Sequence, residues 1–457
     1  MPRPGPPRTT PAGSANKYIA YFTAGTSPSA RAAAVQQAGA TLRRNFTIIE
    51  AAAVTVPNEN ALNALRRHGS VTRVVPDRTV RAFQRAFEKK PQPPPPAPPP
   101  SGGRRQVRSY EVQRVGGPAD GTGIGVAVFD TGIDFQHTDL APAPDTIPAT
   151  AFSAFGSSCD DDGGHGNHVS GLIAALDNNQ DIVGVAPNAK LYCVKVLLGT
   201  LSGDDSDVIA GLQWVRDHYN TVSPPIRIVN MSLGRFLDTA NGETLDNSVL
   251  LAPIQALYNL GISVVVSAGN EPAYEVTALV PSGFREVIAV GGTVATNGIN
   301  LCPGLTYVRA DTAFTNGTDG AFVNGRGVTV SAPAEERVDI LSNGFSCSIL
   351  LYGTLSTTMG GGATRKIPSQ IGLFEARGTS FASPLVAGVV ARVLQLGLVA
   401  HTSNASEVEN VRLWLRNNAD RRQGTDPSPA PLDHPLNGVG GIVYTFDGVR
   451  EGIVSAP

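Results

Sequence analysis

The sequence predicts a doubly wound α/β domain with a mostly parallel sheet and helices on both faces, preceded by a small α+β unit. Three observations support this prediction. Apolar runs alternate with helical patterns from residue 121 onward, a proline-rich run separates off the first part of the chain, and short Gly-rich motifs stand next to strand ends and helix starts. Alternating strands and helices build parallel sheets, whose chemistry lies at the carboxyl ends of the strands.

Residues 17–83 are predicted to form the small unit, which we call the N-terminal unit. Its composition alternates between β-rich and helical segments. The expected strands are Tyr18–Phe22, Phe46–Val56 and Val71–Val80, and the expected helices are Ala30–Ala40 and Asn58–His68. The order β-α-β-α-β is compatible with a ferredoxin-like split βαβ sandwich.

Two further segments flank this unit. Residues 1–16 are Pro-rich and are expected to form a disordered tail, and residues 84–104 are expected to be a linker. The linker holds the run Pro91–Pro100, which favours polyproline II and cannot join a core. Residues 105–457 are then the main domain.

The main domain contains the alternating pattern itself. The predicted strands are Gly125–Phe129, Leu191–Leu197, Ile226–Met231, Ile262–Ser267 and Val287–Val290. The predicted helices are His165–Leu176, Asp205–Asp217, Val249–Leu260 and Ser380–Leu396. Because strands and helices alternate, the strands are expected to run parallel under two layers of helices.

Composition and charge exclude several classes of protein. A chain of 457 residues with 41% hydrophobic and 16% charged residues suits two or three globular domains. Residues 1–104 hold 15 Lys+Arg against 4 Asp+Glu (net +11), and the rest hold 36 − 15 = 21 against 38 − 4 = 34 (net −13). Opposite charges on the two parts favour their mutual attraction, and a chance asymmetry of solvated faces is the alternative interpretation. The basic residues lack the context of a nucleic-acid site, and no apolar run reaches the roughly 18 residues of a membrane span.

The four cysteines are too few for a disulfide scaffold and lack metal-binding spacing. Cys302 and Cys347 lie in loop-like sequence and are the favoured pair for a bridge. Cys193 lies in an apolar run and is expected to be a buried free thiol.

Three motifs carry the chemistry. They contain Asp130 in an Asp-Thr-Gly turn, His165 in Gly-His-Gly-Asn-His, and Ser380 in Gly-Thr-Ser-Phe-Ala. A serine oxygen attacks a carbonyl when a histidine takes its proton and a carboxylate orients that histidine, and Asp…His…Ser is one known chain order of this triad. An aspartic protease would need a second Asp-Thr-Gly or Asp-Ser-Gly, which is absent. Zinc at His165 and His168 would lack a third ligand.

These motifs resemble those of subtilisin-family serine proteases that carry an inhibitory propeptide, over roughly residues 17–83 and 105–450. The resemblance implies that Asp130 orients the base, His165 is the base, and Ser380 is the nucleophile. It also implies that Asn270, in Ser-Ala-Gly-Asn, stabilises the oxyanion together with the backbone N–H of Ser380. The related sedolisins use a glutamate base and an acidic oxyanion residue, so His165 and Asn270 argue against that branch.

The resemblance further implies substrate-binding segments and a metal site. The substrate-binding residues would be Leu201, Ser202, Gly203, Ser232, Leu233, Gly234, Ser267, Ala268, Gly269 and Thr379. A structural Ca²⁺ would be held through Gln106, Asp139, Leu176, Asn178, Gln180 and Ile182, an oxygen-only ligand set that suits calcium. A polar turn without metal is the alternative reading of that loop.

The chain departs from the family pattern at a few positions. Asn167 stands where Thr is usual, Ser170 where Ala is usual, and Phe381 where Met is usual. The segment of residues 334–377 is longer than in compact members, so an extra loop is expected near Ser380.

Residues 77–83 resemble the end of a propeptide that lies in the active site as product, whereas the mature start aligns only near Arg105. The linker is therefore inserted between these two segments. We expect the first self-cleavage to follow Phe83. The primary pocket would then accept an aromatic side chain. The competing hypothesis is a preference for basic side chains. It rests on Asp160, Asp161, Asp162, Asp204 and Asp205.

The expected protein is an endopeptidase that acts on polypeptide substrates, is inhibited by its own propeptide, and is a monomer. An extracellular location is expected from the resemblance. The N-terminus shows no hydrophobic region of a signal peptide, so a cytoplasmic location stays open. The alternatives are a catalytically silent binding protein with the same fold and a non-peptidase hydrolase such as an esterase.

Overall fold

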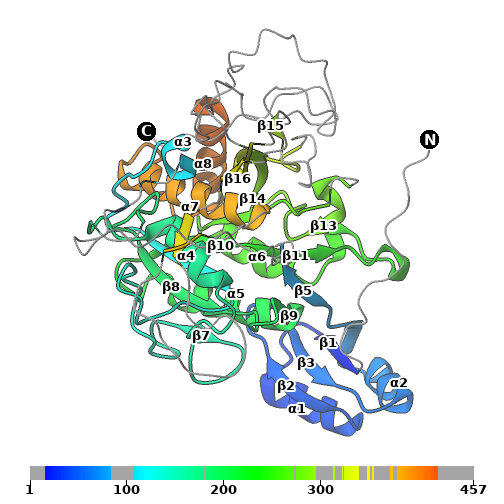
Figure 1. The fold of residues 1–457 in the computed structure, drawn as a ribbon. Coiled ribbons are helices and arrows are strands. Elements are labelled where there is room, and N and C mark those ends of the chain that lie inside the picture. Colours follow the sequence, from blue (N-terminus) through cyan, green and yellow to red (C-terminus); the bar gives the residue numbers. More distant parts are fainter. Residues whose placement is uncertain are drawn as a thin grey trace.

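A computed structural model describes most of both predicted units (Figure 1). It covers residues 16–83, 106, 108, 110–179, 182–271, 274–294, 312–313, 322, 324–338, 347–349, 352–354, 371–373, 378–419 and 457. The expected tail (but for its last residue, Asn16), the proline-rich linker, Gln180 and Cys302 lie outside these residues. Within the described ranges, no helix is both long enough and apolar enough to cross a membrane.

The N-terminal unit is a four-stranded antiparallel sheet in the order β2-β3-β1-β4, with two helices. Its elements are β1 (Lys17–Phe22), α1 (Pro28–Gln37), β2 (Thr41–Asn45), β3 (Ala51–Thr55), α2 (Glu59–Arg67) and β4 (Val71–Pro76). Alternate residues of β1 face opposite sides of the sheet: Ala20 and Phe22 pack in the cluster that contains the helices, whereas Ile19 belongs to a core of the main domain. The sheet therefore joins the two units through its second face.

The main domain is built on a nine-stranded sheet. Its central strands run parallel in the spatial order β16-β14-β12-β10-β6-β8-β7, and β15 and β17 add antiparallel at one side. The strands are β6 (Gly125–Asp130), β7 (Phe152–Ser153), β8 (Lys190–Lys195), β10 (Ile226–Met231), β12 (Ser263–Ser267), β14 (Val287–Val294), β15 (Thr312–Ala313), β16 (Val330–Val338) and β17 (Cys347–Ile349). This arrangement confirms the predicted parallel α/β sheet.

Helices cover both faces of this sheet, as predicted for a doubly wound fold. Val126 and Val128 of β6 pack in one core with α4 and α7, and Ala127 and Phe129 pack in the other with α5 and α6. The helices of the main domain are α3 (Tyr110–Arg114), α4 (His165–Ala174), α5 (Asp205–His218), α6 (Leu251–Tyr258), α7 (Thr379–Gln395) and α8 (Ala405–Asn418). Short 3₁₀ turns are η1 (Thr239–Asn241), η2 (Leu245–Asn247) and η3 (Val276–Ala278).

A second, four-stranded sheet links the two units. Strand β5 (Thr79–Ala82) leaves the N-terminal unit and lies between β9 (Ser202–Asp204) and β11 (Leu233–Phe236), antiparallel to both (Figure 1). Strand β13 (Leu279–Val280) continues this sheet beyond β11. A separate pair, β18 (Tyr352–Thr354) and β19 (Ile371–Leu373), completes the described strands.

Several expected elements differ from the observed ones. The predicted strand Val71–Val80 is in fact two strands, β4 and β5, because the chain leaves one sheet at Asp77 and enters another. The predicted strand Phe46–Val56 begins only at Ala51. The polar edge strand β2 and the helix α8 were not predicted.

The cysteine prediction is wrong for Cys193, which forms a disulfide with Cys159 across 34 residues. The loop that carries Cys159 lies against the carboxyl end of β6, where Ile133 N donates to the carbonyl oxygen of Cys159 at 3.1 Å. That loop therefore meets the neighbouring strand β8, which carries Cys193. The predicted pair included Cys302, which is outside the described residues, so that bridge stays untested.

Candidate active site

Asp130 and His165 meet at the carboxyl end of β6. Asp130 is the last residue of that strand, and His165 is the first residue of α4. The Nδ1 atom of His165 lies 2.8 Å from Oδ1 and 2.9 Å from Oδ2 of Asp130, and both side chains are buried. Asp130 accepts a further bond from Thr131 N at 2.7 Å, so its carboxylate is fixed in the orientation that holds the imidazole.

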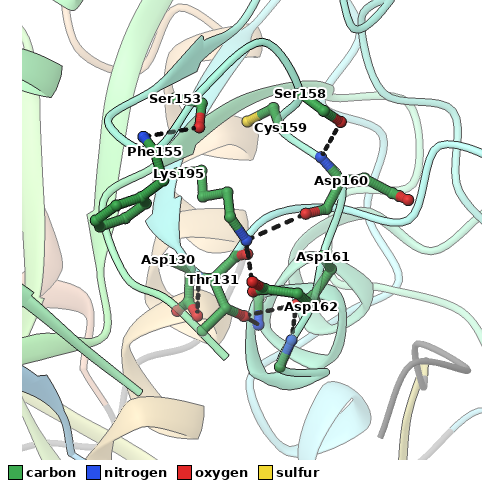
Figure 2. Close-up of polar contacts among 12 residues, drawn as sticks. Asp130, Thr131, Ser153, Phe155, Ser158, Cys159, Asp160, Asp161, Asp162 and Lys195 are labelled. Atoms are coloured by element: carbon green, nitrogen blue, oxygen red, sulfur yellow. Dashed lines mark hydrogen bonds and ion pairs between the residues drawn. The ribbon is translucent and has the colours of Figure 1, made fainter. Parts of the chain in front are cut away.

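The start of α4 is held by a buried carboxylate, Asp161 (Figure 2). Thr131 Oγ1 donates to Asp161 Oδ1 at 2.7 Å and accepts from Gly166 N at 2.9 Å. Further donors to Asp161 are the backbone N–H groups of Gly163, Gly164 and Asn167. Burial raises the pKa of Asp161, while these hydrogen bonds act to lower it. A carboxylate at a helix N-terminus satisfies its free N–H groups, and here it also fixes the position of His165.

Lys195 supports the same region from β8, the strand beside β6. Figure 2 shows its amine pointing to the turns that carry Thr131 and Asp160–Asp162. The Nζ atom donates to Thr131 O, to Asp160 O at 3.2 Å and to Asp162 Oδ1 at 2.5 Å. A buried ammonium thus holds together the two segments that bear Asp130 and His165.

Ser380 is the second residue of α7, and it is fully buried. Its Oγ donates to Ser232 O at 3.1 Å, and Ser232 Oγ donates to Ser380 O at 2.7 Å. In the part of the chain that the structure describes, His165 Nε2 is buried and has no hydrogen-bond partner. The structure therefore joins Asp130 to His165 but turns the Ser380 hydroxyl toward Ser232.

Asn270 follows β12 and faces the start of α7. Its Oδ1 accepts from Thr379 N at 2.9 Å and from Thr379 Oγ1 at 3.1 Å, and Thr379 Oγ1 accepts from Gly269 N at 3.0 Å. These bonds leave the Nδ2 group as the donor that points outward, and it donates to the carbonyl oxygen of Phe83 at 2.5 Å.

The segments expected to bind substrate hold residues 79–83 of the same chain. Strand β5 pairs with β9 on one side, with Val80 opposite Gly203 and Arg81 opposite Ser202, and Leu201 O accepts from Ala82 N at 3.0 Å. On the other side, β5 pairs with Leu233 and Gly234 of β11, and Ser232 O accepts from Phe83 N at 3.2 Å. Ser267 and Ala268 lie buried at the end of β12 beside Asn270.

Two glycines make room for Phe83. A Cβ atom at Gly234 would lie 2.6 Å from Cζ of the Phe83 ring, and a Cβ atom at Gly378 would lie 2.4 Å from the Phe83 carbonyl oxygen. Gly378 also has a φ of 138°, which side-chain-bearing residues rarely adopt. A larger residue at Gly378 would collide with the backbone of Phe83, and one at Gly234 would force its ring to move.

The residues expected to hold calcium gather at one loop. Gln106 Nε2 donates to Leu176 O at 2.5 Å and to Ile182 O at 2.9 Å, and Asp139 Oδ2 accepts from Ile182 N at 3.1 Å. Asn178 belongs to the same loop, and Gln180 is outside the described residues. The described residues hold no group of three or more His, Cys, Asp or Glu side chains placed for a metal. The loop's donors are instead mostly amide and carbonyl oxygens, the ligand type that Ca²⁺ accepts.

The five aspartates proposed as determinants of a basic preference have other roles where contacts are described. Asp161 caps α4, Asp162 pairs with Lys195, and Asp204 pairs with Lys17 at 2.6 Å. Asp205 is fully buried and receives two donors from Arg235. Asp160 presents its backbone carbonyl to Lys195. These contacts disfavour the hypothesis of a basic primary pocket.

Among the described residues, no group of metal-ligating side chains gathers around His168. Its ring packs on Phe381 with centroids 4.6 Å apart, and Phe381 also lies 5.5 Å from the His165 ring. Burial, with His165 nearby, lowers the pKa of His168 to about 3, so the ring is neutral.

Asp161, Lys195 and Thr131 were not identified from the sequence as residues that support the site. Thr131 lies in one predicted motif and Asp161 lies next to another, and this closeness was the available signal.

Comparisons with known proteins agree with this geometry. Residues 121–432 match the peptidase S8 (subtilase) family, which is more than half of the chain. Subtilisin E of Bacillus subtilis (strain 168) is 29% identical over 294 residues, covering 62% of this chain and 66% of that protein. Subtilisin DY of Bacillus licheniformis is 36% identical over 187 residues, covering 40% of this chain and 61% of that protein. The chain thus spans just under two thirds of the length of these relatives.

Among solved structures, fervidolysin from Fervidobacterium pennivorans, a keratinolytic enzyme related to subtilisin, superposes with a TM-score of 0.60 at 20% identity. The match covers 96% of this chain and 60% of that chain, and it supports the fold. The molecule is an α/β protein with a buried Asp–His pair at the carboxyl end of its parallel sheet, where the chemistry of such folds lies. The family match makes this specific: the chain belongs to the subtilase family of subtilisin-like serine proteases.

Proposed function

We propose that this chain is a serine endopeptidase made as a self-processing zymogen, with residues 17–83 as its inhibitory propeptide. One observation carries the proposal. The carbonyl oxygen of Phe83 accepts from Asn270 Nδ2, and the preceding strand β5 is paired on both sides with β9 and β11. A peptide held by backbone pairing, with its carbonyl in a donor site beside a serine, is arranged as a substrate or product.

The proposed reaction uses the residues described above. His165 Nε2 takes the Ser380 proton once the hydroxyl turns from Ser232 O to the imidazole, and Asp130 stabilises the imidazolium. The serine oxygen attacks the carbonyl carbon, and Asn270 Nδ2 and Ser380 N–H hold the oxyanion. The protonated His165 then gives its proton to the leaving amine, which leaves an acyl ester on Ser380. Water, deprotonated by His165, hydrolyses that ester and restores the serine.

We further propose that the first self-cleavage breaks the peptide bond after Phe83. The ring of Phe83 lies against Gly234 and its carbonyl oxygen lies against Gly378, so this residue occupies the primary pocket. The primary pocket of the enzyme would accordingly accept aromatic side chains. Sequencing the N-terminus of the processed protein tests this site, and a start at Arg105 or Gln106 without an earlier cut would contradict it.

A structural Ca²⁺ at the loop of residues 176–182 is part of the proposal. The supporting residues are Gln106, whose side-chain amide lies between two carbonyl oxygens, and the buried carboxylate of Asp139. If the Gln106 amide turned about its terminal bond, its oxygen would face the ion. Bound Ca²⁺ would cross-link this loop to the start of the main domain. It would take no part in peptide hydrolysis.

We infer an extracellular place of action. The disulfide Cys159–Cys193 supports this inference, because such bridges persist in oxidising compartments.

The decisive experiment compares wild-type protein with Ser380→Ala by intact mass after expression. Wild type should shorten and the variant should stay at full length. Ser406→Ala is the control, because Ser406 is an exposed serine of α8 whose hydroxyl bonds only to the local residues Asn404 and Thr402 among the described contacts. It should shorten like wild type.

Two assays on the processed protein separate the alternatives. A fluorophosphonate probe should label wild type at Ser380, and absence of label would favour a silent binding protein. Casein should be hydrolysed. Cleavage of small esters without casein would favour an esterase.

A further inference from the structure

We propose that Asp238 forms a subsite that binds an arginine or lysine five residues before the aromatic residue at the cut. This inference rests on the proposed peptidase function and extends its substrate class. It starts from the side chain of Arg78, which precedes Phe83 by five residues. The Arg78 guanidinium pairs with the Asp238 carboxylate, and both side chains are buried.

The backbone holds Arg78 in the substrate ladder. Thr79 pairs with Asp204 in the β5–β9 register, and the next backbone bond runs from Asp205 N to Arg78 O at 2.8 Å. Arg78 therefore extends the same antiparallel pairing by one residue. Any polypeptide that adds to β9 in this register would bring its corresponding residue to the same place.

The side-chain direction follows from the period of a strand. Alternate residues point to one side, and in this segment Arg78, Val80 and Ala82 are buried against the main domain whereas Arg81 is exposed. The cation of Arg78 is thus directed to the main domain by the same alternation that directs Val80. Arg81, with the same charge, is directed away.

Among the described residues of the main domain, no cation pairs with the carboxylate of Asp238. The Arg235 guanidinium pairs with the carboxylates of Asp205 and Glu243 through hydrogen bonds of 2.8–2.9 Å. Asp238 is left with Asn241 Nδ2 at 2.7 Å and with Arg78. Without Arg78, three carboxylates (Asp205, Asp238 and Glu243) face one guanidinium (Arg235), a formal charge of −2. A cation at this place reduces that charge to −1.

The loop that bears Asp238 is built to hold this carboxylate in place. Glu243 Oε2 accepts from Asp238 N at 2.8 Å and lies 3.9 Å from Arg78 Nε. Because Arg235 fixes Glu243, and Glu243 fixes the backbone of Asp238, the carboxylate is positioned before a substrate arrives. Opposite charges in such a partly buried position attract more strongly than at the surface.

The test uses three internally quenched peptides and the protein that results from self-processing of the full chain. One peptide, the parent, carries the sequence of residues 77–86, and the other two replace either Arg78 or Arg81 by glutamine. Both replacements remove one positive charge. We expect kcat/KM to fall roughly tenfold for the Arg78→Gln peptide, as for loss of one charge-assisted hydrogen bond. It should change less than about twofold for the Arg81→Gln peptide.

Variants of the enzyme identify the carboxylate responsible. The readout is the kcat/KM for the parent peptide divided by the kcat/KM for the Arg78→Gln peptide. Asp238→Asn should lower this ratio to about one. A general loss of activity would not change the ratio, because it affects both peptides equally. Asp246→Asn is the control, because Asp246 is an exposed acid of the same region that pairs with Arg326. It should keep the wild-type ratio.

The outcomes are distinguishable. Equal losses for both substituted peptides, or a ratio unchanged in Asp238→Asn, would overturn the subsite while leaving the peptidase intact. If none of the peptides and no casein were cut, the proposed function itself would fail, and the subsite with it.

Discussion

The orientation of Asn270 is fixed by its neighbours, which makes its amide a prepared donor. Thr379 donates twice to Oδ1, so the Nδ2 group has one direction left, and in that direction lies the Phe83 carbonyl oxygen. A donor that needs no rearrangement stabilises charge that develops on a bound carbonyl.

We therefore predict that Asn270→Ala lowers kcat by about 100- to 1,000-fold with a small change in KM, the loss known for the corresponding donor in a subtilisin rather than a value obtained from this structure. Steady-state kinetics on a peptide substrate would measure both constants. Thr402→Ala, in an exposed turn far from Asn270 in sequence, is a control that should keep both. A loss confined to KM would contradict the oxyanion role.

At the scale of elements, the disulfide Cys159–Cys193 ties the loop of residues 159–164 to β8. The same loop supplies Asp161 to the start of α4 and receives Lys195 from β8. Closure of a loop of 34 residues restricts the unfolded chain by about 4 kcal/mol in the chain-entropy description.

The double variant Cys159→Ala/Cys193→Ala is thus expected to lower the free energy of unfolding by about 2–4 kcal/mol. It should also lower kcat, because the position of His165 depends on this loop. Chemical denaturation and kinetics on the same preparation would check both effects. Full stability together with full activity would show that the hydrogen bonds of Asp161 and Lys195 suffice.

The calcium proposal concerns another loop and gives a separate prediction. Chelation with EDTA should lower the melting temperature of wild type, and added Ca²⁺ should restore it, since a ligand bound only to the folded state stabilises that state. Asp139→Asn should respond much less to either treatment. A wild-type melting temperature that is indifferent to EDTA and Ca²⁺ would favour a polar turn without metal.

The elements that could be predicted from the sequence are those with strong local patterns. Strand β10 has the predicted bounds, and helix α5 differs by one residue. A β-branched, mostly apolar segment marks the strand, and a carboxylate-rich start marks the helix. Strand β2 was missed because its sequence, Thr-Leu-Arg-Arg-Asn, is that of a polar edge. Helix α8 was overlooked although Val408, Val411 and Leu415 mark a buried face.

The residues of the candidate site were likewise predictable only where a local sequence pattern marks them. Asp130, His165 and Ser380 lie in recognisable motifs, whereas the pairing of Cys159 with Cys193 depends on which loop passes which strand. Asp161 entered only the competing hypothesis of a basic preference, because its burial and its four hydrogen-bond donors become apparent only in the folded chain. The disulfide and the bond from Thr131 Oγ1 to Asp161 join segments 30 or more residues apart, so no local pattern reveals them.

At the scale of the whole molecule, the interface between the N-terminal unit and the main domain is rich in buried carboxylates. Asp77 accepts from Arg43 at 2.9 Å and from Ser206 N at 2.9 Å, and burial raises its pKa. Burial, opposed mainly by Arg235, raises the pKa of Asp205 to about 6. Burial, opposed mainly by the bond from Asp204 N, raises the pKa of Asp207 to about 6. Asp77 adds to both shifts.

Raised pKa values give the sign of the pH effect. On dissociation these carboxylates return toward their usual pKa of about 4, so the complex binds more protons than its parts between roughly pH 4 and 6. These three carboxylates therefore weaken the association as the pH rises from about 4 through 6. Asp238 acts in the opposite direction at lower pH, because bonds from Asn241 and Arg78 lower its pKa against the effect of burial. Each unit of pKa lost on release corresponds to roughly a tenfold weakening.

The proposed self-cleavage would yield a complex on which this can be measured. The readout is the fraction of free N-terminal unit in size-exclusion chromatography between about pH 4 and 8, the range that brackets these shifts. We expect more dissociation at the neutral end of this range than at the acidic end, and a flatter profile for Asp77→Asn. Tighter association at higher pH would contradict the assignment.

The covalent ring closed by Cys159 and Cys193 has one more consequence. It encloses the whole of α4, including His165, and the loop of residues 176–182. If autolysis nicks that loop, the two fragments stay joined through sulfur, and the imidazole keeps its tether to the sheet. Such a nicked molecule would migrate as one species without reductant and as two with it, so electrophoresis that leaves the bridge closed would not separate it from the intact chain.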